Sequence, residues 1–160
     1  MKIGLISDTH GQTEAISRAA KLFQRQSAES IVHTGDVTRP AHLESLLEPG
    51  WPVQLAVGNM DPAAKAFQHL TNIYNLTVNK MAGQIKINDS RLGITHGHLD
   101  SALRQLRRDD LDCIIHGHTH ERRDEHIDGV RMINPGAAKS PQKSCALLDL
   151  NTGALDFYSL

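Results

Sequence analysis

The sequence predicts an α/β fold, and three observations support that prediction. Five short apolar runs, typical of buried strands, each end in a turn that contains glycine and polar residues. Segments of helical periodicity separate the first runs, which is typical of parallel βαβ units. The second half of the chain changes to closely spaced strand patterns. Mixed sheets covered by helices on two sides account for all three observations.

The five apolar runs share the chemistry that follows them. Each is succeeded by residue types that bind metal ions: Ser-Asp-Thr-His-Gly, Thr-Gly-Asp, Gly-Asn-Met-Asp, Thr-His-Gly-His and His-Gly-His-Thr-His. In open α/β sheets, ligands bind outside the carboxyl ends of strands. One such turn would be weak evidence for a site, because glycine turns with polar neighbours are common in any globular chain. Five in succession predict one polar site assembled from five loops. The runs are residues 3–6, 30–33, 53–57, 91–94 and 111–115.

The segments between the runs predict crossover helices. A first helix begins near Thr13, which we expect to cap it, and an apolar stripe recurs at helical spacing up to Phe23. A second helix over residues 40–48 ends at Pro49-Gly50, and a third covers residues 63–70. We expect Asp61 to cap this third helix.

The second half of the chain is expected to form strands, with one further helix over residues 101–109. Turns at Ala82-Gly83 and Asn88-Asp89 would join the first of these strands. The mixed charges of residues 122–125 indicate a solvated face. The predicted strands are residues 76–78, 84–87, 92–95, 130–133, 145–150 and 155–158.

Length and composition limit the functions that the chain could have. The 160 residues are most simply one domain, residues 1–160, without internal repeats. A net charge of -1 and a pI near 6.8 argue against broad binding to long nucleic acids. Cys113 and Cys145 lie in apolar runs, so we expect buried thiols and a cytoplasmic protein. No signal peptide or membrane-spanning stretch is expected.

The candidate ligands are two carboxylates, one amide and four imidazoles, without a thiolate. They are Asp8, His10, Asp36, Asn59, His96, His118 and His120. This set suits Mn²⁺, Fe, Zn²⁺, Co²⁺ or Ni²⁺ better than copper, an iron-sulfur cluster or calcium. Seven residues are too many for one tetrahedral zinc, but they suit two ions that share a bridging carboxylate. We therefore predict a dinuclear centre.

At this point the residues resemble the calcineurin-like metallophosphoesterases. That family orders its motifs as Asp-x-His, Gly-Asp, Gly-Asn, His and Gly-His-x-His, and residues 1 to about 137 follow the same order. The short length and the Ile-Ser-Asp-Thr-His-Gly opening resemble its small bacterial and archaeal phosphodiesterase branch. The resemblance implies a two-sheet β-sandwich flanked by helices, a four-layer αββα architecture. It also implies hydrolysis of a phosphate ester by a metal-bridging hydroxide.

The resemblance also assigns roles to the ligands. Asp8, His10 and His120 would hold one ion, Asn59, His96 and His118 the other, and Asp36 would bridge them. Two divalent ions against two carboxylates leave about +2, or about +1 with a bridging hydroxide, which suits an anionic ester. Manganese is the first expectation for the native metal.

Three further residues bear on the reaction. His98 follows a ligand by two positions, so it could contact the phosphate or orient a ligand; a structural turn histidine is the alternative. Arg39 could reach a substrate phosphate, although a surface arginine is the simpler interpretation. Met60 stands where many larger relatives carry a histidine that assists the leaving group. Because Met60 cannot donate a proton, good leaving groups should be favoured.

The leading hypothesis is a phosphodiesterase that acts on small phosphodiesters or nucleotide-derived esters. The alternatives are a phosphomonoesterase, a nuclease, or a scaffold like the retromer subunit of related fold. A scaffold has no need to retain all seven ligands. We expect a small phosphoester substrate and no membrane partner, while association into homo-oligomers stays open.

Overall fold

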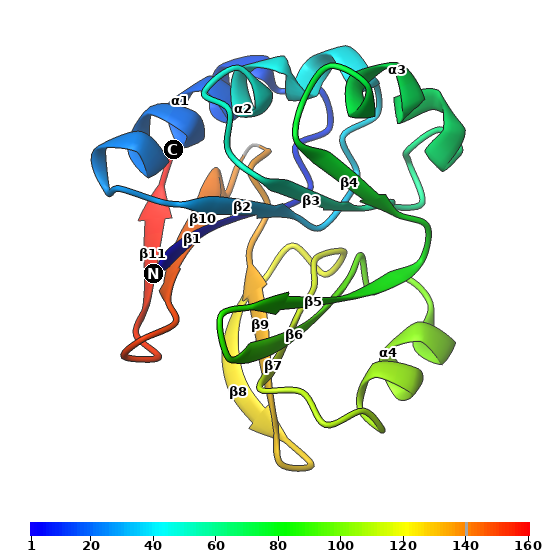
Figure 1. Cartoon of the computed structure of the whole chain (residues 1–160), viewed down its shortest axis with the longest axis vertical. Helices are drawn as coiled ribbons and strands as arrows, with labels where there is room; N and C mark the ends of the chain where they lie inside the picture. Colours follow the sequence, from blue (N-terminus) through cyan, green and yellow to red (C-terminus); the bar gives the residue numbers. More distant parts are fainter. Residues whose placement is uncertain (140) are drawn as a thin grey trace.

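Two β-sheets pack face to face in the computed structural model, which describes residues 1–139 and 141–160 (Figure 1). In the first sheet the strand order is β11-β10-β1-β2-β3-β4, and β1 to β4 are parallel. The antiparallel pairs β1–β10 and β10–β11 complete it. Its strands are β1 (Lys2–Ile6), β2 (Ser30–His33), β3 (Val53–Ala56), β4 (Leu76–Asn79), β10 (Ser144–Asp149) and β11 (Leu155–Ser159).

The second sheet has the order β5-β6-β7-β9-β8. Its central strands β6, β7 and β9 are parallel, and the edge strands β5 and β8 are antiparallel to their neighbours. Both sheets are therefore mixed, as predicted. The strands are β5 (Ala82–Ile87), β6 (Ser90–Thr95), β7 (Cys113–Ile115), β8 (Arg122–Ile127) and β9 (Val130–Pro135).

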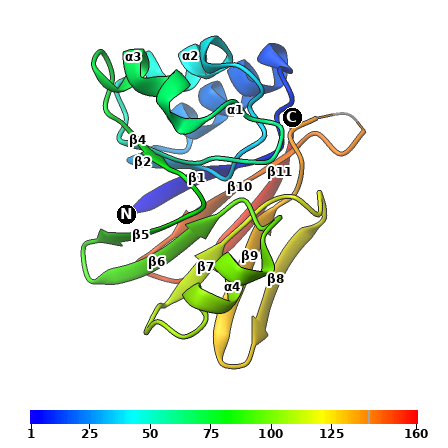
Figure 2. The same cartoon turned by 90° about the vertical axis from the view of Figure 1, so that its right-hand side faces the viewer.

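Helices cover the outer side of each sheet, which gives the expected four layers (Figure 2). Most of the helices lie over the first sheet, and α4 (Asp100–Leu106) covers the second. The described residues include no helix long and apolar enough to cross a membrane. The helices over the first sheet are α1 (Thr13–Arg25), η1 (Pro40–Leu43), α2 (Glu44–Leu47), η2 (Ala64–Phe67) and α3 (Gln68–Thr71).

Side chains of β1 alternate between the two faces of the first sheet, and this alternation explains how the layers pack together. Ile3 and Leu5 face the second sheet and join the apolar cluster between the sheets, while Ile6 joins the cluster beneath the helices. Phe23 of α1 is fully buried in that outer cluster. Burial of a large apolar side chain contributes roughly 1.5–3 kcal/mol. The strands are therefore fixed on both faces, and their carboxyl ends are held rigidly.

Two local predictions were wrong, and one strand was not anticipated. Gln12, not Thr13, is the N-cap of α1, and no side chain caps the helix. Ala82 and Gly83 lie inside β5, and a Cβ at position 83 would lie 2.3 Å from Asn79 Oδ1, so a larger residue there would displace the Asn79 side chain. The charged segment Arg122–Ile127 is the edge strand β8, whose backbone pairs with β9 while most of its side chains face solvent.

Candidate metal centre

The seven predicted ligands meet at the carboxyl ends of five strands. They extend from the loops that follow β1, β2, β3, β6 and β7, and each lies close to at least one other. Strands of both sheets contribute, because β1, β2 and β3 belong to the first sheet and β6 and β7 to the second. The prediction of one site from five loops is consistent with this geometry.

One half of the site is built from Asp8, His10 and His120. Their ligand atoms all lie within 4.8 Å of one another. Asp8 Oδ1 is 3.2 Å from His120 Nε2 and 4.0 Å from His10 Nε2. A carboxylate and two imidazoles at this spacing could hold one metal ion.

The other half is organised around His96. Its Nε2 lies 3.0 Å from Asn59 Oδ1 and 3.4 Å from Asp36 Oδ1. The His118 ring stands nearly perpendicular to the His96 ring, with the centroids 5.1 Å apart. Asp36 lies between the two halves, because its second oxygen, Oδ2, is 3.5 Å from His10 Nε2. Asp36 therefore has one oxygen for each half.

Two orphaned atoms indicate that the first half suits a cation. Asp8 Oδ1 and His10 Nε2 are buried and form no hydrogen bond with any described residue. Leaving a buried polar atom unpartnered costs about 1–3 kcal/mol. Asp8 Oδ2, in contrast, accepts the Ser7 hydroxyl at 2.5 Å and the His118 backbone N–H at 3.1 Å. These donors leave Oδ1 as the free ligand atom, so the residues present fit a divalent ion.

The backbone of the site is held in a conformation that costs energy. Five of the seven predicted ligands have a φ in the left-handed region, between 43° and 69°. Non-glycine residues adopt this conformation at a cost of order 1–3 kcal/mol each, and such residues cluster at functional sites. The five are Asp8, His10, Asp36, His118 and His120.

Neighbouring groups that the motifs did not identify orient the ligands. The Thr34 carbonyl lies 2.7 Å from His96 Nδ1, so the Nε2 of that ring faces the site. Asn134 donates to the Gly117 carbonyl and to the Thr119 hydroxyl, both at 3.0 Å. Asn134 thus supports the loop of His118 and His120.

Electrostatics favour an ionised Asp36 carboxylate. Burial would raise the pKa of Asp36, but hydrogen bonds from His96 and from the Met60 backbone N–H lower it to about 2. Burial would lower the pKa of His96, but contacts with Asp36 and the hydrogen bond to the Thr34 carbonyl outweigh it, so the pKa is raised. Burial, together with the charge of Lys139, lowers the pKa of His10. Sequence reasoning did not identify Lys139, which carries no motif.

Asp61 does not cap a helix, contrary to the prediction. Its Oδ2 accepts the backbone N–H groups of Gly58 at 2.8 Å and Asp36 at 2.9 Å. Its Oδ1 accepts the N–H of Thr38 at 2.7 Å. Asp61 therefore joins the loop that carries Asp36 to the loop that carries Asn59.

The remaining candidates differ in their placement. His98 lies against the site, with its ring centroid 5.3 Å from that of His96 and 6.1 Å from that of His118. Its Nδ1 is buried without a hydrogen-bond partner among the described residues. Arg39 is exposed, and Met60 is 56% exposed.

The other histidines lie outside the cluster of predicted ligands. His33 and His116 are buried, whereas His69 and His126 are exposed. His42 is half-buried, with Nδ1 3.1 Å from the Val37 carbonyl. That contact draws the ring of His42 against its own loop.

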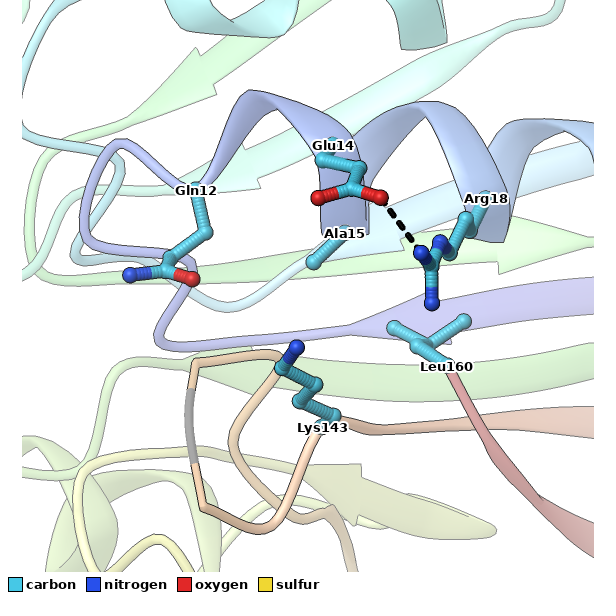
Figure 3. A pocket seen from close by; sticks show the side chains of 6 residues that line it. All are labelled: Gln12, Glu14, Ala15, Arg18, Lys143 and Leu160. Carbon is cyan, nitrogen blue, oxygen red and sulfur yellow. Dashed lines mark hydrogen bonds and ion pairs between the residues drawn. The ribbon is translucent and has the colours of Figure 1, made fainter.

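A small hollow beside α1 is separate from this chemistry (Figure 3). It has room for about one water molecule. One wall carries the ion pair between Glu14 and Arg18, and none of the seven predicted ligands lines it. Its lining residues are Gln12, Glu14, Ala15, Arg18, Lys143 and Leu160. We assign it no role in the site.

Comparison with known proteins agrees with the family resemblance found in the sequence. Residues 1–153 match the calcineurin-like phosphoesterase superfamily domain. Phosphodiesterase MJ0936 of Methanocaldococcus jannaschii is 33% identical over 138 residues, which cover 85% of this chain and 83% of that protein. The solved structure of an archaeal phosphodiesterase superposes with a TM-score of 0.87 at 28% identity and covers 100% of both chains.

The fold is also shared with a trafficking protein. Vacuolar protein sorting 29 of Cryptosporidium parvum superposes with a TM-score of 0.71 at 22% identity, covering 99% of this chain and 98% of that one. At this identity the likeness concerns the fold alone. The choice between catalysis and scaffolding therefore depends on the site residues.

Proposed function

This chain belongs to the calcineurin-like phosphoesterase superfamily and to its small phosphodiesterase branch, and from that premise we propose that it is a divalent-metal-dependent phosphodiesterase. The substrates would be small phosphodiesters or nucleotide-derived esters. One observation carries the proposal: the seven predicted ligands lie together, and a free carboxylate oxygen of Asp8 faces the imidazoles of His10 and His120.

We assign the ligands to two ions. Asp8, His10 and His120 would hold one ion, Asn59, His96 and His118 the other, and Asp36 would contact both. The distances of 3.5 Å and 3.4 Å from the two Asp36 oxygens to imidazoles of opposite halves support the bridging role. Mn²⁺ is the first candidate, and Fe, Zn²⁺, Ni²⁺ and Co²⁺ suit the same nitrogen and oxygen donors.

When bound, a pair of divalent ions lowers the pKa of a shared water and polarises the phosphoryl oxygens. The side chains of this chain prepare that site. Asp36, whose pKa is lowered to about 2, stays ionised at neutral pH. Asn59 is uncharged, so it leaves the site with a positive excess that attracts an anionic ester.

His98 and Met60 bear on how the substrate would be bound and which leaving groups would be favoured. His98 lies against His96 and His118 and has a buried, unpartnered Nδ1, so we propose that it contacts the substrate phosphate or orients these ligands. Met60 carries no titratable proton and is exposed. Esters with good leaving groups should therefore react fastest. Arg39 is exposed and is a weaker candidate for a phosphate contact.

The alternatives make different use of the site. A scaffold has the same fold, but it does not need seven such side chains together, five of them on strained backbone and two with buried ligand atoms unpartnered among the described residues. A nuclease needs a charged track for a long polyanion, and the net charge is only -1. We propose a small phosphoester as the partner and leave self-association open. Two buried free thiols, Cys113 and Cys145, suit the reducing cytoplasm.

The experiment compares bis-p-nitrophenyl phosphate with p-nitrophenyl phosphate, using chelator-stripped protein with and without Mn²⁺. His118→Ala serves as the blank, because it removes one ligand and leaves the fold of the sandwich in place. We expect metal-dependent release that is faster for the diester and absent from the blank. Faster hydrolysis of the monoester would identify the protein as a phosphomonoesterase. A folded protein without activity in any of the five metals would favour the scaffold.

A further inference from the structure

The half-buried Asp61 carboxylate lies between two loops of the candidate metal centre. One loop, residues 35–38, follows β2 and carries Asp36, and the other, residues 57–61, follows β3 and carries Asn59. Three backbone N–H groups from these loops donate to Asp61, at 2.7 to 2.9 Å. We call this arrangement the Asp61 clasp: the carboxylate together with the N–H groups of Asp36, Thr38 and Gly58.

The loop after β2 has a strained backbone that such hydrogen bonds can stabilise. Asp36 has a φ of 58° and Thr38 a φ of 76°. A positive φ is uncommon for aspartate and an outlier for a β-branched threonine. The clasp binds the N–H of each of these two residues, so it stabilises the backbone where it is most strained. Hydrogen bonds to an ionised carboxylate are stronger than those to neutral acceptors.

The two loops are also joined in the reverse direction. The N–H of Met60 donates to Asp36 Oδ1 at 2.9 Å. The side chain of each aspartate thus accepts backbone N–H groups from the loop that carries the other. Four hydrogen bonds between or within the two loops therefore fix where Asp36 and Asn59 lie relative to each other.

We propose that Asp61 is a positioning residue that holds Asp36 between the two metal positions and keeps Asn59 against His96. The inference rests on the proposed function, in which Asp36 and Asn59 are ligands. Asp61 acts through the loops and not on the substrate, because backbone N–H groups occupy both of its oxygens. It is therefore not a replacement for the proton donor that Met60 cannot provide.

The test uses Asp61→Asn, which keeps the size of the side chain but replaces one acceptor oxygen with an NH₂ group. Asp89→Asn in the exposed turn between β5 and β6 is the matched control. Mn²⁺ affinity is measured by competition with a chelator. Turnover is measured on methyl p-nitrophenyl phosphate and methyl phenyl phosphate, whose leaving groups differ in pKa.

We expect Asp61→Asn to lose about 10- to 100-fold in metal affinity or turnover, as is usual for partners of metal ligands. The loss in turnover should be equal for the two esters, and Asp89→Asn should match the wild type. Metal affinity and turnover within twofold of the control would overturn the proposal. A loss confined to the poorer leaving group would also overturn it, because that result identifies a proton donor.

Two measurements distinguish failure of this proposal from failure of the proposed function and from failure of the variant to fold. If the wild type binds Mn²⁺ but hydrolyses no ester, the proposed function fails, while the affinity comparison still tests the clasp. If Asp61→Asn does not fold, amide hydrogen exchange on the wild type replaces it. We then expect the N–H groups of Asp36, Thr38 and Gly58 to be protected. Exchange at the rate of free amides would overturn the proposal.

Discussion

Gly58→Ala tests how closely the loop after β3 approaches the candidate bridging carboxylate. A Cβ at position 58 would lie 2.2 Å from Asp36 Oδ1 and 2.5 Å from its backbone nitrogen, whereas ordinary contacts begin at 3.4 Å. Asp36 or the loop must therefore move by roughly 1 Å, and a displacement of that size can cost about 100-fold in rate. That loss corresponds to about 2.7 kcal/mol of transition-state stabilisation.

The assay is metal-dependent hydrolysis of bis-p-nitrophenyl phosphate, with thermal unfolding measured in parallel to confirm that the variant is folded. Gly129→Ala is the control, because Gly129 has a φ of 84° with no atom within 4 Å of the added Cβ. It should lose about 1 kcal/mol of stability through backbone strain and keep its turnover. Wild-type turnover in Gly58→Ala would refute the placement of Asp36 against this loop.

Three further predictions concern the ligands and the core. Asp36→Asn, which weakens the proposed shared ligand, should reduce diester turnover more than Asp61→Asn, and equal losses would mean that the role assigned to Asp61 is wrong. His118→Ala should bind fewer Mn²⁺ ions per chain by elemental analysis, whereas unchanged stoichiometry would remove it from the ligand set. Burial lowers the pKa of His33 to about 4, below the ordinary value of 6.5, so the unfolded chain binds the proton more readily. Its contribution to stability is therefore complete above pH 6.5 and is lost progressively as the pH falls from 6.5 to 4. Urea unfolding in chelator should show a loss on the order of 2 kcal/mol between pH 7.5 and pH 5, reduced in His33→Asn. Equal pH dependence in this variant and the wild type would contradict the assignment to His33.

The ligand positions were predictable because their signal is local. Each ligand follows a short apolar run, and parallel strands bring their carboxyl ends to one edge of a sheet. The layers were predictable only through the family resemblance, since periodicity does not distinguish one mixed sheet from two. The structure added what distant contacts decide. The Asp61 clasp joins residues up to 25 positions apart, which no motif records.

The missed strand β8 has a similar explanation. Its sequence, Arg122–Ile127, is nearly all charged, so hydrophobic patterning gives no strand signal. Backbone pairing with β9 holds it, together with two hydrogen bonds from Arg131 to Asp124, at 2.7 and 2.9 Å. Charged side chains are typical of edge strands, because they discourage pairing with another chain. Its position at the edge of the sheet could only be recognised from the fold.

The central claim is a dinuclear, metal-dependent phosphoesterase, and the most direct measurement titrates Mn²⁺ into the chelator-stripped protein. Bound Mn²⁺ per chain and hydrolysis of bis-p-nitrophenyl phosphate are followed together at neutral pH. We expect no hydrolysis without metal, and activity that rises as two ions bind per chain. Below roughly pH 6, protonation of the histidines should release metal and activity together. Full hydrolysis in excess chelator at neutral pH would contradict the claim.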